Sequence, residues 1–401
     1  MSSVRKVTDD LYWVGANDRR THLFENLHPI PRGVSYNSYL LLDKKNVLFD
    51  TVDWSCCREF LDNVAEVLGG KQLDYLVVNH MEPDHAASVE EVLLRYPKCK
   101  VISNEKAFMF MHQFGFTTAE ERKDEVKEGD TRCFGKHTVT FVFAQMVHWP
   151  EAMVTFDTTN GVLFSADAFG SFGALDGRLF ADEVDFDKDW LPDARRYFCN
   201  IVGKYGPFVQ TLLQKAGTVP IKIFCPLHGP VWRENLEYYI DKHDKWSRCE
   251  PERQGVMIAY ASMYGYTAEA AQVLASKLSQ QGINDIVIYD VSSTHVSELV
   301  AQAFNYSHIV LASVTYNLNI FPPMYDFLHH LKILNFQKRT FGIIENGSWA
   351  IKSGSLMREF IEQELKECMV LGAQVSINSR ANDSNDHEFE ALAESIAKTM
   401  K

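Results

Sequence analysis

Residues 79–85 read Asn-His-Met-Glu-Pro-Asp-His and follow directly on the apolar run LDYLVV. Two histidines and two carboxylates thus fall within six residues, after what reads as a short buried strand. Ligand-type side chains this close together would repel one another or remain unpaired unless a cation gathers them. The pattern therefore predicts a metal site, and the alternative is an ordinary polar surface loop. The candidate ligands are His80, Glu82, Asp84 and His85.

Three further ligand-type residues lie downstream, each after a hydrophobic run. His148 follows the strand-like run HTVTFVFAQMV, Asp167 ends the run GVLFSAD, and His228 ends the run IKIFCPLH. A single buried histidine is more often a satisfied core residue than a ligand. Because seven ligand-type residues at successive strand ends are poorly explained by chance, we predict that they form one metal constellation.

The first ligand motif also suggests its local structure. His80 and Glu82 alternate on an extended stretch, and Pro83 is expected to block an early helix. A helix is expected over the following run, AASVEEVLLRY. The motif would then lie at the C-terminal end of a strand, which is the usual place for a site in an α/β layer.

The elements that must position these residues divide the chain in two. Strand-like runs with helical patterns between them suggest a layered α/β arrangement in the first part. A polar stretch with Pro and Gly, residues 247–255, is a candidate linker. After it the β-α-β alternation is regular, which is typical of a doubly wound parallel sheet. With a length of 401 residues, we expect two domains, residues 1–250 and 254–401.

Composition excludes several functions. The net charge of −13 argues against a nucleic-acid partner, because phosphates would be repelled. No apolar run approaches the roughly 18 residues needed to cross a membrane, and the N-terminus lacks the apolar segment of a signal peptide. We expect a cytoplasmic enzyme.

The eight cysteines do not form a C-x-x-C pair, so neither a rubredoxin-type iron site nor a zinc ribbon is encoded. Reduced core thiols are expected, since a cytosolic chain rarely keeps disulfides. The vicinal pair Cys56-Cys57 leaves a redox role open.

The second predicted domain begins with a strand that runs into a polar loop and then a helix. Backbone N–H groups, hydroxyls and a helix N-terminus suit a phosphate there. Because there is no G-K-[ST] pattern, a monophosphate is favoured over a nucleoside triphosphate. The candidate residues are Ser262, Met263, Tyr264, Gly265, Tyr266 and Thr267.

Two more loops follow predicted strands of this domain, at the sheet edge where a flat ring system would rest. An indole or phenol can stack on such a ring, although Trp349 could also be ordinary packing. The candidates are Thr315, Tyr316, Asn317, Asn319, Asn346, Gly347, Ser348 and Trp349.

The motif HMEPDH with the three later ligands resembles the metallo-β-lactamase-fold signature. The zinc hydrolases of that fold have His where this chain has Glu82, whereas Glu is typical of flavodiiron proteins, also called A-type flavoproteins. The phosphate loop resembles the flavodoxin pattern [ST]-x-[ST]-G-x-T, except that Tyr264 replaces the usual Ser or Thr. Across the whole chain, the resemblance implies an N-terminal metallo-β-lactamase-like αβ/βα sandwich and a C-terminal flavodoxin-like doubly wound parallel sheet.

The resemblance also implies cofactors and roles. FMN would bind the second domain and two iron ions the first, and anionic donors such as Glu82 favour iron over zinc. By resemblance, one iron is held by His80, Glu82 and His148, and the other by Asp84, His85 and His228. Asp167 bridges the two irons. Three residues are expected beside the gas pocket, with ordinary packing or a surface position as the alternative: His22, His28 and Tyr197. Trp149 and Trp349 are candidates for a junction between the two cofactors.

Electron counting links the two expected cofactors. FMN and a di-iron centre each hold two electrons, and four electrons reduce O2 to two waters. Two electrons reduce two NO to N2O and water, so we expect an O2 and/or NO reductase.

We expect no appended rubredoxin module, and no G-x-G-x-x-G fingerprint follows a predicted strand. The resemblance therefore implies an external donor, rubredoxin or reduced coenzyme F420. It also implies a head-to-tail homodimer, or a dimer of such dimers. Two rivals remain: a zinc hydrolase fused to a flavodoxin domain, and an electron-transfer flavoprotein with an inactive metal domain.

Overall fold

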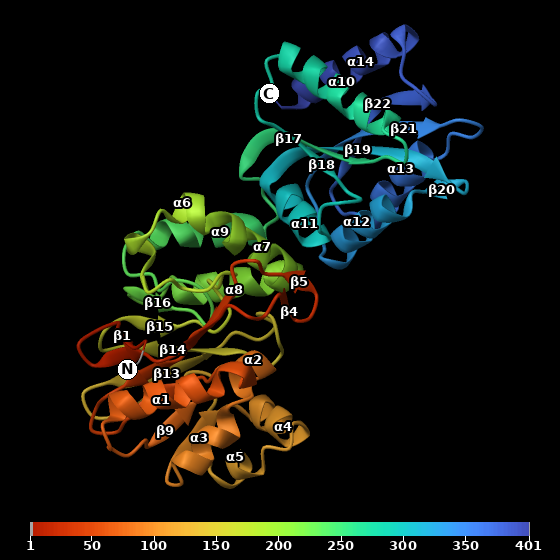
Figure 1. Ribbon diagram of the computed structural model, residues 1–401. Helices are drawn as coiled ribbons and strands as arrows, with labels where there is room; N and C mark the ends of the chain where they lie inside the picture. The colour runs from red at the N-terminus through yellow and green to blue at the C-terminus, as the bar shows by residue number, and fades with distance from the viewer. Residues whose placement is uncertain (1–2, 401) are drawn as a thin grey trace. The chain divides into compact units, whose positions relative to one another are not determined.

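The computed structural model describes residues 3–400 (Figure 1), which form two compact units. The boundary between the units lies between Asp244 and Lys245, inside helix α9 (Leu236–Ser247). It thus falls just before the polar stretch 247–255. Among the described residues, no helix has both the length and the apolar character needed to span a membrane.

The first unit contains two large sheets. The first sheet has antiparallel pairing from β1 to β8 and parallel pairing from β8 to β11. Its strands, in spatial order, are β1 (Arg5–Lys6), β2 (Leu11–Trp13), β7 (Tyr39–Leu41), β8 (Val47–Phe49), β9 (Tyr75–Val77), β10 (Lys100–Ser103) and β11 (Lys123–Glu125).

The second sheet is antiparallel except for its last pair. Its strands are β12 (Thr131–Cys133), β13 (Thr138–Phe143), β14 (Met153–Asp157), β15 (Val162–Phe164) and β16 (Ile223–Cys225). Two short pairs complete the β-structure of the unit: β3 (Ala16–Asp18) with β6 (Val34–Tyr36), and β4 (Leu23–Phe24) with β5 (His28–Pro29).

The two large sheets pack face to face through aromatic rings. Phe49 of β8 stacks on Phe164 of β15 with ring centroids 3.7 Å apart, and Tyr39 of β7 meets the same ring edge-on. Both phenylalanines are buried, so this stack lies in the core of the sandwich. In Figure 1, α1 and α3 lie on one side of strands β13–β16 and α8 and α9 on the other. This αβ/βα layering confirms the expected fold class of the first unit.

The helical segments of the first unit connect these strands. They are η1 (Trp54–Cys56), α1 (Cys57–Leu68), α2 (Pro83–Ala86), α3 (Val89–Arg95), α4 (Glu105–Gln113), α5 (Thr117–Glu121), η2 (Ala181–Glu183), α6 (Phe186–Asp189), α7 (Leu191–Tyr197), η3 (Phe198–Val202), η4 (Gly203–Tyr205), α8 (Gly206–Ala216) and α9. Helix α1 shows how the sequence encodes them: Phe60, Val64 and Leu68 recur at a four-residue spacing and are buried, and Gly69 ends the helix in a left-handed conformation.

The second unit is a parallel sheet in the order β18-β17-β19-β21-β22. In chain order within the unit this is 2-1-3-4-5, the flavodoxin-like order, so the expected fold class of this unit is also confirmed. The strands are β17 (Arg253–Ala261), β18 (Ile286–Asp290), β19 (Tyr306–Tyr316), β21 (Thr340–Gly347) and β22 (Met369–Asn378), and β20 (Asn319–Ile320) pairs with β19.

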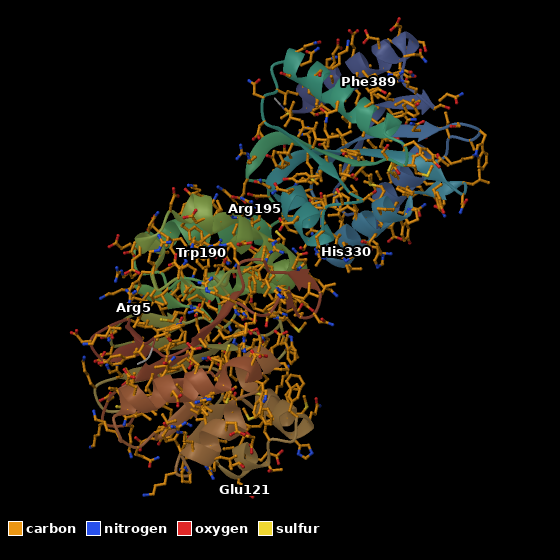
Figure 2. All side chains as sticks on the ribbon, in the orientation of Figure 1. Arg5, Glu121, Trp190, Arg195, His330 and Phe389 are labelled. Atoms are coloured by element: carbon orange, nitrogen blue, oxygen red, sulfur yellow. The ribbon has the colours of Figure 1, made fainter. Side chains whose placement is uncertain are left out.

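Helices cover both faces of this sheet (Figure 1). The helical segments are α10 (Tyr266–Gln280), α11 (Val296–Asn305), α12 (Pro322–Ile333), α13 (Ser353–Glu364), η5 (Asp383–Asn385) and α14 (Asp386–Thr399). Leu274 of α10 and Leu392 of α14 belong to one buried cluster with residues of β17, β19 and β21. Phe389, labelled in Figure 2, is a buried member of the same cluster. Neither β22 nor α14 was expected from the sequence.

Two local expectations were wrong. Pro83 does not delay the helix but opens α2 at its first position, where a missing N–H costs nothing. The run that precedes His148 is also not one strand, because β13 ends at Phe143. Residues 144–152 instead form a turn, closed by the hydrogen bonds Ala144 N to Ala152 O and Met146 N to Trp149 O.

The eight cysteines form no disulfide; six of them, including Cys56 and Cys57, are buried, whereas Cys133 is exposed and Cys368 is half-buried. The expectation of core thiols thus agrees with six of the cysteines and is wrong for Cys133 and Cys368.

A buried histidine ties the two sheets together at one edge. His137, just before β13, places Nδ1 2.7 Å from Oδ2 of Asp157, the last residue of β14. Its Nε2 lies 2.9 Å from Oδ2 of Asp10, which directly precedes β2 of the other sheet. Burial alone would lower the pKa of His137, but the two carboxylates raise it above its ordinary value. The folded chain therefore holds this proton more tightly than the unfolded chain does.

We predict that His137→Gln destabilises the first unit in a pH-dependent way. Since folding raises the pKa of His137, its stabilisation is fully present below the unfolded pKa of about 6.5 and disappears as the pH rises through the folded pKa. The free energy of unfolding should fall by about 2–3 kcal/mol at about pH 6 and by less at about pH 9. Urea unfolding curves at the two pH values measure the difference.

The matched control is His112→Gln, because His112 pairs with Glu120 on the surface. That pair should contribute no more than about 1 kcal/mol at either pH. A difference for His137→Gln that did not depend on pH would mean that His137 is neutral in the folded chain.

Candidate metal centre

All seven candidate ligands converge at one end of the first unit's sandwich. His80 follows β9 and Asp167 follows β15, each three residues after the strand ends. His228 follows β16 at the same distance, and His148 lies in the turn between β13 and β14. The remaining three lie at the start of the short helix α2. The ligands thus come from both sheets, at ends that the packing of the sandwich brings together.

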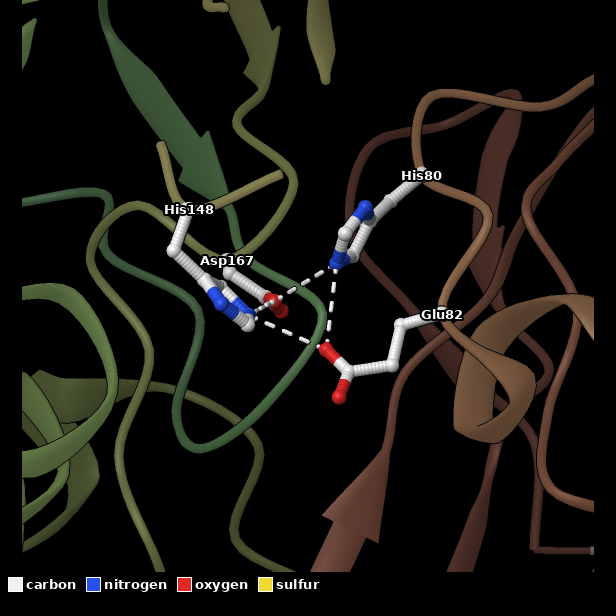
Figure 3. A group of neighbouring side chains, drawn as sticks. All are labelled: His80, Glu82, His148 and Asp167. Carbon is white, nitrogen blue, oxygen red and sulfur yellow. Dashed lines mark hydrogen bonds and ion pairs between the residues drawn. The ribbon is translucent and has the colours of Figure 1, made fainter. Parts of the chain in front are cut away.

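Four of these residues form a first group (Figure 3). His80 Nε2 lies 3.3 Å from Glu82 Oε2 and 3.1 Å from Asp167 Oδ2. His148 Nε2 lies 3.0 Å from the same Glu82 oxygen and 3.1 Å from the same Asp167 oxygen. Two imidazole nitrogens and two carboxylate oxygens therefore alternate around one point, and all four residues are buried.

The second group consists of Asp84, His85 and His228. Asp84 Oδ2 lies 3.3 Å from His85 Nε2 and 3.2 Å from His228 Nε2. Asp167 Oδ1 lies 3.3 Å from His85 Nε2 and 3.7 Å from His228 Nε2. One oxygen of Asp167 thus faces the first group and its other oxygen faces the second, which is the arrangement of a bridging carboxylate.

The donor atoms fit two cations. An octahedral ion with bonds of about 2.1 Å has neighbouring ligand atoms about 3.0 Å apart, close to the separations above. Both carboxylate oxygens of Asp84 and Oδ1 of Asp167 are buried without a hydrogen-bond partner among residues 3–400. The Nε2 atoms of His85 and His228 point at each other across 3.0 Å. A buried site rarely leaves such polar atoms unpaired unless an ion satisfies them.

The electrostatics of the site also favour cations. Burial would lower the pKa of His80, but Asp167, Glu151 and Glu82 raise it well above its ordinary value. Burial would raise the pKa of Asp167, but His80, His148 and His85 hold it well below its ordinary value. The carboxylates therefore create a negative potential at the site. Protons balance this potential when no metal is bound, and metal cations displace those protons when they bind.

Two contacts outside the ligand set orient the histidines. His80 Nδ1 lies 2.9 Å from Oε1 of Glu151, and His228 Nδ1 donates to the carbonyl of Ser35 at 2.8 Å. Neither partner was anticipated. Glu151 had a local signal, because it follows His148 in the run HWPEAM, whereas Ser35 lies far from His228 in sequence and had none.

A pocket of about 520 Å³ reaches the candidate ligands Glu82 and Asp84 from the surface. It is also lined by Thr21, Leu23, Phe24, Glu25, Asn26, Tyr36, Asp53 and Pro83. Glu25 is a titratable residue that was not anticipated, and burial together with the nearby Glu82 raises its pKa to about 7.

The residues expected beside a gas pocket are not among those that line this one. His22 is exposed, and His28 is buried with its ring 6.1 Å from that of Phe172. Tyr197 is buried with its ring centroid 5.5 Å from that of the candidate ligand His228. Tyr197 is thus in contact with the candidate ligand set.

The candidate phosphate loop lies at the N-terminus of α10 in the second unit. Gly265 adopts a positive φ of 95° at the helix start, and its N–H donates to Ser262 Oγ at 3.0 Å. The buried Thr267 hydroxyl accepts from Asn346 Nδ2 at 3.2 Å. The hydroxyl of Thr315 accepts backbone N–H groups at the start of α13. The three predicted loops therefore gather at the C-terminal edge of the sheet.

Aromatic side chains are exposed around these loops. Tyr264 is 86% exposed and Trp349 is 78% exposed, so Trp349 does not pack in the core of the unit. A neighbouring hollow of about 400 Å³ is lined by Tyr316, Asn317 and Asn319, together with Ile320, Pro322, Tyr325, Asp326 and His329. Met263 and Tyr266 are also partly exposed, while Gly347 is buried and Ser348 is exposed with its hydroxyl 3.0 Å from that of Ser379. Open aromatic surface at this edge suits a flat ring ligand.

Comparisons with known proteins agree with this geometry. A family model described as ODP family beta lactamase matches residues 34–229. The chain is 31% identical over 403 residues to the anaerobic nitric oxide reductase flavorubredoxin of Aeromonas hydrophila subsp. hydrophila, covering 97% of this chain and 77% of that protein. It is 29% identical over 404 residues to the rubredoxin-oxygen oxidoreductase of Megalodesulfovibrio gigas, covering 99% of this chain and 98% of that protein.

Solved structures show the same fold over nearly the whole chain. The rubredoxin oxygen:oxidoreductase from Desulfovibrio gigas superposes with a TM-score of 0.91 at 27% identity, covering 99% of this chain and 98% of that one. The flavodiiron protein from Giardia intestinalis gives a TM-score of 0.91 at 23% identity, covering 99% and 97%, which speaks for the fold alone. The ligand motif, the two-unit architecture and the full-length similarity lead to one conclusion: the chain belongs to the flavodiiron protein family.

Proposed function

We propose that this chain is an oxidoreductase that reduces O2 to water, NO to N2O, or both. The reaction takes place at a non-haem di-iron centre in the first unit. FMN in the second unit relays electrons from an external donor. The balanced reactions are O2 with four electrons and four protons to two waters, and two NO with two electrons and two protons to N2O and one water.

The observation that carries the proposal is the orientation of the Asp167 carboxylate. Its Oδ2 lies 3.1 Å from the imidazole nitrogens of His80 and His148, and its Oδ1 lies 3.3 Å from that of His85. A carboxylate shared in this way fits two adjacent ions. We assign His80, Glu82 and His148 to one iron, and Asp84, His85 and His228 to the other.

When bound, the iron pair supplies open positions and two electrons for a diatomic gas, and FMN supplies two more electrons. The chain's own residues shape the surroundings. The rings of Phe24, Tyr36 and Tyr197 pack around the ligand His228 at centroid distances of 5.3, 5.8 and 5.5 Å. This apolar wall limits water beside the second group and suits an apolar gas.

The zinc-hydrolase alternative is not favoured. The full-length relatives are named as nitric oxide and oxygen reductases, and Glu82 supplies an anionic oxygen that suits iron. The alternative of an inactive metal domain is opposed by the convergence of all seven ligands.

The donor and the assembly are part of the proposal. The relative from Megalodesulfovibrio gigas is named for rubredoxin, and we propose rubredoxin as the donor, with reduced coenzyme F420 as the alternative. We further propose a head-to-tail homodimer, or a dimer of such dimers, in which the FMN of one subunit serves the di-iron centre of the other. Both units expose large side chains, as interface regions do before assembly: Trp54 and Met109 in the first unit, and Tyr264 and Trp349 in the second.

The test of the function compares initial rates of O2 and NO consumption with reduced rubredoxin, for the wild type and Asp167→Ala. The substitution removes both oxygens that face the two groups. We expect iron content to fall to less than half of the wild-type value and gas consumption to fall to the background rate of free flavin, while FMN stays bound. Metal analysis and flavin absorbance give the two contents.

The matched control is Asp157→Asn, a buried carboxylate of the same sheet that pairs with His137 away from the ligands. It should retain iron and turnover. A wild-type chain that carries zinc in place of iron and consumes neither gas would reject the reductase and favour the hydrolase.

We predict that Thr267→Ala weakens FMN binding without changing iron content. The substitution removes a buried hydroxyl at the N-terminus of α10, where the phosphate is expected. A hydrogen bond to a charged group contributes about 1.5–3 kcal/mol, so the FMN dissociation constant should rise about 10–100-fold. Flavin fluorescence titration measures the constant.

Ser276→Ala on the same helix is the control, because Ser276 is exposed and its hydroxyl donates to Gln272 O. It should bind FMN as tightly as the wild type. Loss of iron with intact flavin binding in Thr267→Ala would reverse the roles given to the two units.

The head-to-tail dimer predicts complementation between inactive variants. Asp167→Ala keeps FMN but lacks the bridge, and a flavin-free preparation of Thr267→Ala keeps the irons. After random reassociation, half of the dimers are mixed and each has one intact pair, so roughly a quarter of wild-type activity should return. Activity is measured before and after mixing in the absence of free FMN. If electrons pass only within one chain, mixing will restore nothing.

A further inference from the structure

Glu151 is a buried carboxylate that the proposed reaction does not yet use. It is 1% exposed and lies in the turn between β13 and β14 that also carries His148. Its Oε1 accepts the backbone N–H of Met81 at 2.9 Å and lies 2.9 Å from His80 Nδ1. Its Oε2 has no hydrogen-bond partner within residues 3–400. Through Oε1, this side chain thus makes both of its hydrogen bonds to the segment that bears His80.

This contact determines which nitrogen of His80 carries a proton. Glu151 Oε1 already accepts one N–H group, from Met81, so it acts as an acceptor towards Nδ1 as well. Nδ1 of His80 therefore carries the hydrogen, and the lone pair of a neutral ring lies on Nε2. Figure 3 shows Nε2 directed at Glu82 and Asp167, while the other ring nitrogen points away from the group.

In the second group, the Nδ1 atoms of the two histidines make a weaker hydrogen bond or none. His228 Nδ1 donates to a neutral carbonyl, that of Ser35, and His85 Nδ1 has no partner in the described part of the chain. Of these three ring nitrogens, only that of His80 therefore faces a carboxylate. A carboxylate behind a metal-binding imidazole raises its basicity and fixes its orientation.

We propose that Glu151 is a positioning residue for one of the two metal positions. It holds His80 in the tautomer that presents Nε2, and its charge makes the position of His80, Glu82 and His148 the tighter one. The same charge favours the ferric over the ferrous ion at that position. This inference rests on the metal centre of the proposed function.

The test uses the apo form of the full chain and titrates it with Co²⁺, whose absorption reports each bound ion. Glu151→Gln keeps an oxygen acceptor in place and removes the charge. One of the two binding steps should weaken about 10–100-fold, while the other step should not change. Asp157→Asn removes the carboxylate of a comparable His–Asp pair in the same sheet and should leave both steps unchanged.

Two further measurements distinguish positioning from folding stability. In the zinc-loaded chain, ¹⁵N-labelled histidines should show a downfield Nδ1–H proton that is assigned to His80 and disappears in Glu151→Leu. In the iron-loaded chain, Glu151→Gln should raise one of the two reduction potentials, by about 59 mV for each tenfold loss of ferric preference.

The outcomes separate the two proposals. Equal Co²⁺ binding by the wild type and Glu151→Gln, or equal weakening of both steps, would overturn the role of Glu151 and leave the di-metal centre intact. A wild-type chain that binds no Co²⁺ would overturn the metal centre itself, and with it this inference.

Discussion

The interaction on which the rest of the first unit depends is that of the Asp167 carboxylate with the imidazoles around it. Asp167 is 1% exposed, the histidines at positions 80, 85 and 228 are fully buried, and Glu82 and His148 are less than a tenth exposed. Such a set of buried charges is unfavourable by itself, because each group loses its hydration. Two cations remove that cost, since every donor atom then has a partner. The centre is therefore a place where folding and metal binding are coupled.

The candidate ligands can converge because the scaffold packs together two sheets whose strands are connected in different ways. In the first sheet, His80 and the residues of α2 follow the parallel strand β9. In the second sheet, His148 lies in the turn between the antiparallel strands β13 and β14. The stack of Phe49 on Phe164 holds β8 against β15, the strand that leads to Asp167. Packing in the core thus fixes the distance between ligands that lie far apart in sequence. The flavodoxin-like unit follows the same rule on its own, since its loops gather at one edge of a parallel sheet.

Much of this organisation could be predicted from the sequence, because its signals are local. The motif HMEPDH, the apolar runs before each later ligand and the β-α-β alternation after residue 255 each lie within a few residues. The features that could not be predicted from the sequence depend on tertiary contacts. Ser35 supports His228 from a distant part of the chain, and Glu25 reaches the pocket from a loop that has no motif. Strand β22 escaped notice because it is an edge strand of mixed burial, without a continuous apolar run. Pro83 was misread because proline breaks a helix from inside but starts one at its first position.

The choice of Glu82 over a histidine follows from the charge that the centre must balance. Three carboxylates, Glu82, Asp84 and Asp167, face the two positions together with four imidazoles. A histidine at position 82 would leave two carboxylates, and the net charge of the loaded centre would rise by one unit. That change penalises the ferric state more than the ferrous state, because the more highly charged ion gains most from an anionic ligand. Zinc keeps one oxidation state and has no such requirement. A glutamate at this position is therefore what a redox centre needs and what a hydrolytic zinc centre can omit.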